Sequence, residues 1–289
     1  MNDGKRLSST AIADQLRERI QSGRLRPGQR LPTQVQLADE FGVQRGAVRQ
    51  ALRILQSEHL LTNVSKGSPP RVAAPIPAPE EPRPALVGLA PRLEEAFSEP
   101  DVRIDASCLT AETLMRSMHA PLNLIERKKV SPKSVKVRIV LPPRDLRRHY
   151  PAPDGGWGHD DDVDRAVHQR SVDQHKRQVA WFDGHFHMLR TAYRIDANVE
   201  FRVGDGTPFH KLYLLNDTEV LFGHYVIGTK EGEVEVDGVS RDLRDAWGTE
   251  SRLFSFRRQY GARDELFVED TKTWFNALWE TLSPDVKDS

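Results

Sequence analysis

The stretch GVQRGAVRQALRILQ, residues 42–56, combines a basic stripe with an apolar one. Its basic stripe consists of Arg45, Arg49 and Arg53, which recur every four residues. In an α-helix each such step advances about 400° and about 6 Å, so the three guanidinium groups form one nearly straight row. The apolar side chains of the same helix are Val48, Ala51, Leu52 and Leu55. The stretch therefore predicts a helix that packs on a core through one face and presents cations on another.

The residues before this stretch predict two further helices. Residues 8–23, SSTAIADQLRERIQSG, carry apolar side chains at helical spacing, and residues 24–32 form a turn around a Pro-Gly pair. Thr33 and Gln36 then have the spacing of a capping box, and Gly42 ends the second helix. Helix, glycine-containing turn and helix make a helix-turn-helix, in which the opening stretch is the second helix.

The segment after the basic helix predicts a wing. Residues 59–72, HLLTNVSKGSPPRV, indicate a short strand, a turn at Ser65, Lys66 and Gly67, and a returning strand. A cation at the tip of this wing is expected to lie near a DNA phosphate. The N-terminal module is therefore a winged helix-turn-helix.

Charge and proline content divide the chain. The formal net charge is zero, but residues 1–72 hold 12 Lys or Arg against 6 Asp or Glu, a net charge of +6. Residues 69–84 contain seven prolines, which favour an extended spacer over a packed core. The boundaries that follow are a winged helix-turn-helix over 1–72, a Pro-rich linker over 73–85 and a second domain over 86–289. The basic module is expected to bind a polyanion.

Residues 10–72 resemble the DNA-binding domain of the GntR family of bacterial transcription regulators. The resemblance is carried by GRLRPGQRLPTQVQLADEFGV at 23–43, by R-x-x-V-R-x-A-L at 45–52, and by the Leu-Leu pair with the wing. It implies a transcription regulator that binds a palindromic double-stranded operator as a homodimer, with a C-terminal domain for dimerisation and for sensing a small-molecule effector.

The resemblance places the start of the second helix in the major groove and the wing tip on the minor-groove side. The DNA-binding residues it predicts are Thr33, Gln44, Arg45, Gly46, Ala47, Arg49, Arg53, Lys66 and Gly67. Gln44, Gly46 and Ala47 stand where the family usually has Ser or Thr, so the operator of better-known members is not transferred to this chain. The amide of Gln44 could pair with adenine instead.

The second domain predicts an α/β fold with a mixed sheet. Strands are expected at 102–110 and 134–142, a helix at 110–129 capped by Thr110, and a helical segment at 163–190 broken near Gly184. A hairpin and a closing helix follow. Its order of elements weakly resembles one half of a phospholipase D-like fold.

That resemblance implies a phospholipase D-like fold that lacks phospholipase D catalysis. Catalysis in the phospholipase D superfamily uses an H-x-K motif, whereas His210 and Lys211 are adjacent and point to opposite faces of a strand. A DNA-targeted phosphodiesterase remains the alternative function, and a partner-binding module without a ligand is a third. A chorismate-lyase-like sensor domain matches only the DGTP stretch at 205–208, and the pyridoxal-phosphate branch of the family needs a longer chain.

No catalytic residue, cofactor or metal site is predicted. His185 and His187 diverge on a helix, and the acidic run after His159 is expected to be solvated surface. For an effector, the candidates are polar residues on apolar elements: Arg138, Arg190 and Lys211.

The single Cys108 excludes an internal disulfide, and no apolar run is long enough to cross a bilayer. These features predict a cytoplasmic protein without membrane partners.

Overall fold

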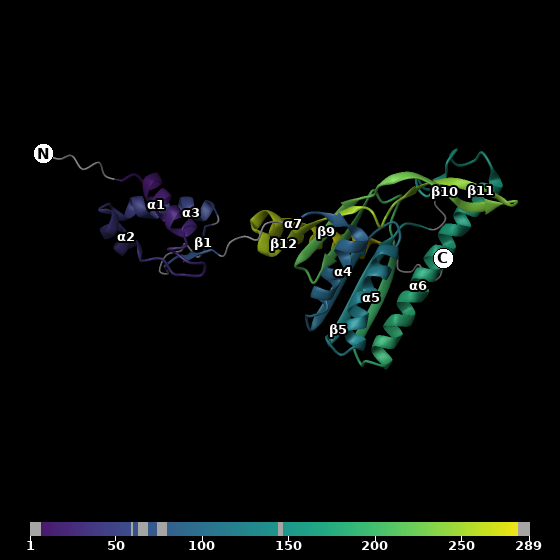
Figure 1. Cartoon of the computed structure of the whole chain (residues 1–289), viewed down its shortest axis with the longest axis horizontal. Helices are drawn as coiled ribbons and strands as arrows, with labels where there is room; N and C mark the ends of the chain where they lie inside the picture. Colours follow the sequence, from purple (N-terminus) through teal and green to yellow (C-terminus); the bar gives the residue numbers. More distant parts are fainter. Residues whose placement is uncertain (1–6, 59, 63–68, 74–79, 144–146, 283–289) are drawn as a thin grey trace. The chain divides into compact units, whose positions relative to one another are not determined.

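The computed structural model describes residues 7–58, 60–62, 69–73, 80–143 and 147–282. The chain divides into two compact units, Met1–Pro77 and Ala78–Ser289, and each is described by itself (Figure 1). Among the described residues, no helix combines the length and apolar character that a bilayer crossing demands.

The N-terminal unit is the expected winged helix-turn-helix. Its elements are α1 (Ser9–Gln21), α2 (Gln34–Phe41), α3 (Arg45–Ser57), β1 (Leu61–Thr62) and β2 (Arg71–Val72). The two strands pair antiparallel, and Arg71 also bridges to Arg30 in the turn between α1 and α2. The predicted tip of the wing, Ser65 to Gly67, lies outside the described residues.

Local signals fix where these helices begin and end. The Ser8 side chain caps α1 by accepting from the Ala11 amide at 3.1 Å. The predicted capping box at Thr33 and Gln36 is confirmed in both directions, with the Thr33 amide 2.8 Å from Gln36 Oε1. Gly42 ends α2 in the left-handed region at φ 64°, a conformation that favours glycine.

The core of this unit is formed where α3 packs on α1 and α2. All four predicted apolar residues of α3 are fully buried: Val48, Ala51, Leu52 and Leu55. Burial of a Val or Leu side chain contributes about 1.5–3 kcal/mol, and burial of the smaller Ala51 contributes less. Val35 of α2, in contrast, is 41% exposed.

The C-terminal unit has fourteen helices and strands within its described residues, besides a short 3₁₀ turn at Arg258–Tyr260. They are β3 (Arg83–Pro84), α4 (Ala85–Ala96), β4 (Asp101–Ser107), α5 (Glu112–Glu126), β5 (Ser134–Leu141), β6 (Ala152–Pro153), α6 (Asp161–Thr191), β7 (Asp196–Val203), β8 (His210–Leu215), β9 (Glu219–His224), β10 (Ile227–Val236), β11 (Val239–Ala246), β12 (Arg252–Arg257) and α7 (Ala262–Thr281).

The large sheet is mixed, as predicted. Its seven strands lie in the order β3-β12-β9-β8-β4-β5-β7; the β4–β5 and β5–β7 pairs are parallel, and the other pairs are antiparallel. A separate sheet has the order β10-β11-β6. Its β10–β11 hairpin lies at the end of the domain where α6 begins (Figure 1), and Val234 and Leu243 of the hairpin pack on Val163 and Val167 of α6.

Helices cover both faces of the large sheet. Alternate strand residues such as Ile104 and Tyr213 join the core beneath α4, α5 and α6, which Figure 1 shows side by side. Residues of the opposite pleat, such as Leu212 and Leu214, pack with Val268 of α7. The alternation of strand side chains therefore separates two apolar layers.

Several expectations need correction. Helix α6 is continuous for 31 residues through Gly184, because Phe182 and Phe186 on either side are fully buried in the core. Helix α5 begins without a Thr110 cap. The predicted linker 73–85 also runs too far, since Arg83 and Pro84 pair with β12 and Ala85 is fully buried.

Gly223 gives a test of the sheet. A Cβ added to this residue would lie 2.3 Å from the Arg252 carbonyl oxygen, a backbone atom of the neighbouring strand β12. We expect Gly223→Ala to lower the free energy of unfolding by roughly 2–3 kcal/mol, because the two backbones must separate. Urea denaturation followed by tryptophan fluorescence measures this change.

The matched control is Gly155→Ala, whose added Cβ meets no atom within 4 Å. It should change stability by no more than about 0.5 kcal/mol. Equal stability of the two variants would contradict the close β9–β12 approach.

Candidate functional site

The predicted DNA-binding residues of the second helix lie together at the start of α3. Gln44 is its N-cap residue, and its side chain makes no capping hydrogen bond. Gly46 and Ala47 occupy the first turn, and a Cβ added at Gly46 would meet no atom within 4 Å. The amide of Gln44 and the first turn of α3 are thus open to an incoming molecule.

The basic stripe of α3 lies on an exposed face of the helix. Arg45, Arg49 and Arg53 are all exposed, and α3 itself contains no acidic residue. Within the described part of the chain, no carboxylate lies within 4 Å of any of the three guanidinium groups. The burial of Val48, Ala51, Leu52 and Leu55 holds this face outward.

Other arginines of the same unit are used differently. Arg17 of α1 reaches Glu58 just after α3 at 2.6 Å, and Arg19 of α1 reaches Glu40 of α2 at 2.6 Å. These pairs connect neighbouring helices. Glu58 and Glu40 are therefore held by arginines of α1, and neither pairs with the cations of α3.

The remaining predicted DNA contacts divide into two groups. Thr33 uses its hydroxyl in the capping box of α2, at 3.3 Å from the Gln36 amide, so the structure gives it a structural task. Lys66 and Gly67 lie outside the described residues. The strands β1 and β2, which lead to and from them, are paired as a wing requires.

The three effector candidates lie at separate places in the C-terminal unit. Arg138 of β5 forms a bidentate pair with buried Asp105, at 2.6 and 2.7 Å, on the α7 face of the sheet. Arg190 donates to the Ala197 carbonyl oxygen at 2.8 Å and joins the end of α6 to β7. Lys211 lies on the opposite sheet face, so the three do not form one site.

Lys211 is the unusual member of this group. It is only 2% exposed, and its Nζ donates to Thr113 Oγ1 at 3.1 Å and to the Gly248 carbonyl oxygen. In the described ranges no carboxylate lies within 4 Å of this amine, and burial lowers its pKa to about 8. Both hydrogen-bond partners belong to the wall of a cavity.

This cavity lies between the start of α5, the middle of α6 and the β10–β11 hairpin, and it encloses about 220 Å³. Its wall is mainly polar and includes Thr113, Arg116, Gln174, Gln178, Lys230 and Asp245. Gln178 accepts from the Ala111 amide at 2.8 Å, so a side chain of α6 caps the start of α5 in place of Thr110. The sequence did not predict this site, because the burial of Gln178 within α6 is a property of the fold.

Metal-binding geometry is absent from the described residues, where no group of three or more His, Cys, Asp or Glu side chains is placed to hold an ion. Asp160 in the acidic run caps α6 by accepting from the Asp162 and Val163 amides at 3.0 and 3.2 Å. His185 stacks on Trp181, with ring centroids 3.9 Å apart. Cys108 is buried and unpaired, and burial raises its pKa to about 12.

In a winged helix-turn-helix the second helix enters the DNA major groove, and exposed cations on that helix are typical of a DNA-binding domain. Comparison with known proteins agrees: the family model described as "Bacterial regulatory proteins, gntR family" matches residues 8–68. The family assignment therefore applies to this domain, residues 8–68.

A curated relative supports the same assignment. The mannosyl-D-glycerate transport/metabolism system repressor MngR of Escherichia coli (strain K12) is 51% identical over 53 residues, which are 18% of this chain and 22% of that protein. The match thus spans only about a fifth of the relative's length.

Two solved structures have low TM-scores. YtrA from Sulfolobus acidocaldarius, a GntR-family transcription factor, is 30% identical over 25% of this chain and 74% of its own, with a TM-score of 0.22. Phosphatidylserine synthase from Haemophilus influenzae Rd KW20 is 12% identical over 80% of this chain and 46% of its own, with a TM-score of 0.32. Neither score supports an argument about the fold of the second unit.

Lys211 generates a stability prediction. Its pKa of about 8 in the folded protein is below the 10.5 of an ordinary lysine, so unfolding takes up a proton between these pH values. The cost of burying the charged amine is therefore fully present below pH 8 and is lost as the pH rises towards 10.5. Lys211→Met should raise the free energy of unfolding by about 1–2 kcal/mol at pH 7 and by less at pH 10.

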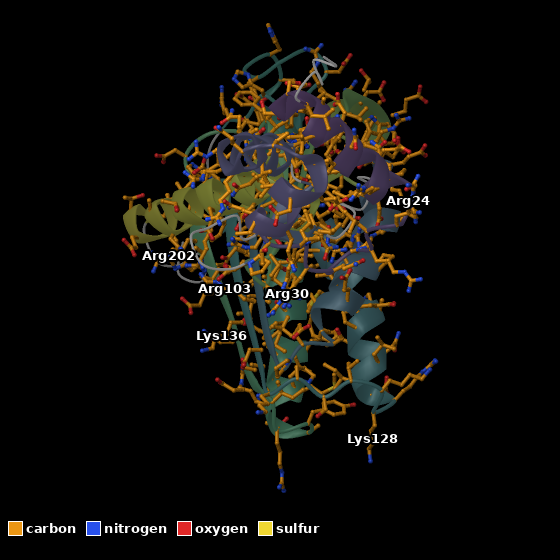
Figure 2. The ribbon with its side chains drawn as sticks, turned by 90° about the vertical axis from the view of Figure 1, so that its left-hand side faces the viewer. Arg24, Arg30, Arg103, Lys128, Lys136 and Arg202 are labelled. Atoms are coloured by element: carbon orange, nitrogen blue, oxygen red, sulfur yellow. The ribbon has the colours of Figure 1, made fainter. Side chains whose placement is uncertain are left out.

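Urea denaturation at both pH values checks this, with Lys136→Met as the control. Lys136 is an exposed lysine of the same sheet, and Figure 2 shows its side chain projecting away from the ribbon. A loss of stability at pH 7 in Lys211→Met would mean that the Thr113 and Gly248 hydrogen bonds outweigh the cost of burial.

Proposed function

We propose that this chain is a one-component transcription regulator of the GntR type that binds double-stranded operator DNA. The proposal rests on the exposed row of Arg45, Arg49 and Arg53 on α3, the second helix of the helix-turn-helix. None of the three forms an ion pair within the described residues. In this motif the start of the second helix meets base edges and phosphates in the major groove. Gln44 and Arg45 lie at that start, and Arg49 is one turn further along.

The proposed operator is palindromic and the proposed active form is a homodimer. Two-fold DNA symmetry requires a two-fold protein, with half-sites about one helical turn apart. We assign dimerisation to the C-terminal unit, because the described N-terminal unit uses its apolar faces in its own core. The wing residues Lys66 and Gly67 are assigned to the minor-groove side.

The C-terminal unit is proposed to sense a small molecule without catalysing a reaction. An effector would act through different affinities for DNA-competent and DNA-incompetent arrangements of the dimer. The phosphodiesterase alternative finds little support, because His210 packs beside Phe222 at 4.9 Å between ring centroids, whereas Lys211 reaches Thr113 on the other side of its strand. A regulator of this kind acts in the cytoplasm, where its DNA lies.

Fluorescence anisotropy on the DNA upstream of its own gene tests this proposal. Arg49→Ala should weaken binding about 10-fold or more and make the dependence on salt less steep, because one base or phosphate contact is lost. A salt series on this duplex and on an unrelated duplex separates specific from general binding.

Arg24→Ala is the matched control. Arg24 belongs to the same unit, is exposed and pairs with Glu18 at 3.2 Å (labelled in Figure 2), so its removal should leave specific binding within about two-fold. Equal, weak binding of both duplexes by wild type and both variants would refute the proposal.

A further inference from the structure

The cavity of the C-terminal unit is built from elements that are far apart in the chain. Thr113 comes from the start of α5, Gln174 and Gln178 from α6, and Lys230 and Asp245 from the β10–β11 hairpin. At about 220 Å³ it is too small for a peptide or an extended cofactor. A polar enclosed space of this kind is favourable only when water or a polar ligand satisfies its walls.

The carboxylates around the cavity are already neutralised by the protein. Glu112 pairs with Arg116 at 2.9 Å. On the hairpin side, Asp245 pairs with Lys230 at 2.9 Å, and Glu233 pairs with Arg170 at 2.5 Å. These three ion pairs leave no excess negative charge in that part of the wall, so they do not favour a cationic ligand.

Positive charge, in contrast, is left in excess. Lys211 contacts two residues of the wall, Thr113 and Gly248, and has no carboxylate within 4 Å in the part of the chain that the structure describes. The wall also contains the first residues of α5, whose leading amides have no intrahelical acceptors and form the positive end of the helix dipole. Both features favour an anionic group at the same corner of the cavity.

We propose that this cavity binds a small polar metabolite carrying a carboxylate or phosphate group, with that group at the start of α5 and near Lys211. The remainder of the ligand would meet hydroxyl and amide groups of Thr110, Ser171 and Gln174. A hydroxy acid or a sugar phosphate has this combination of groups. This inference rests on the proposed function, in which it identifies the class of effector.

The position of the cavity also gives a mechanism for sensing. The β10–β11 hairpin is held to α6 by Arg170, which reaches both Glu233 and Asp245, at 2.5 and 3.5 Å. A ligand between the hairpin, α5 and α6 would add contacts to all three elements at once. Binding would therefore stabilise one placement of the hairpin against the helices.

Thermal unfolding of the full chain tests the proposal. Inorganic phosphate, glycerol 3-phosphate and malate are added at constant ionic strength, with glycerol as the uncharged counterpart of glycerol 3-phosphate. We expect at least one anion to raise Tm by roughly 5–10 °C at about 100 times its Kd, and glycerol to have no effect. A response to the phosphates alone assigns a phosphate ligand, and a response to malate alone assigns a carboxylate.

Lys211→Met and Lys136→Met complete the design, each compared with its own Tm without ligand. The Lys211 variant should lose affinity at least ten-fold although its fold is retained, whereas the Lys136 variant should bind as the wild type does. No shift with any anion, or equal affinity of the Lys211 variant, would overturn the proposal. Because DNA is not present, failure here leaves the anisotropy result unaffected, and failure of DNA binding leaves this result standing.

Discussion

The rotation of α3 about its own axis is the constraint on which the proposed function depends. Four fully buried side chains, Val48, Ala51, Leu52 and Leu55, fix that rotation against α1 and α2. Together they contribute several kcal/mol, far more than exposed ion pairs could recover by turning the helix. The arginine row must therefore face away from the core. Hydrophobic burial thus orients the charged surface that meets DNA.

A similar division of tasks occurs in the C-terminal unit. Its sheet buries apolar side chains on both faces, and its buried charges lie where specific partners hold them, as Asp105 holds Arg138. Lys211 differs from this pair among the described residues, since its charged amine is buried with a hydroxyl and a carbonyl oxygen as hydrogen-bond partners and no carboxylate within 4 Å. Burying the charged amine in this way lowers the stability of the folded protein. Binding of an anionic ligand near the amine would offset that loss.

The sequence predicted the N-terminal unit well because its signals are local. The capping box at Thr33, the glycine at 42 and the four-residue spacing of α3 all act within a few residues. In the C-terminal unit, the alternating strands β4 and β5 and the hairpin of β8 and β9 were also predictable. The β10–β11 hairpin had a signal as well, the Asp237-Gly238 turn with both residues at positive φ.

The features that the sequence did not predict depend on contacts between residues that are far apart in the chain. Gly184 was expected to break α6, but burial of Phe182 and Phe186 outweighs the helix penalty of one glycine. The cap of α5 comes from Gln178, 67 residues away, and the partners of Lys211 are 98 and 37 residues away. No local sequence pattern predicts these contacts, so the cavity could be found only in the folded structure.

Methylation interference on the operator tests the central claim most directly. Methyl groups at guanine N7 lie in the major groove, whereas those at adenine N3 lie in the minor groove. If α3 reads the major groove as part of a two-fold dimer, guanine methylation should block binding at two symmetric clusters about one helical turn apart. Interference confined to adenine N3, or none at either position, would contradict a major-groove role for α3.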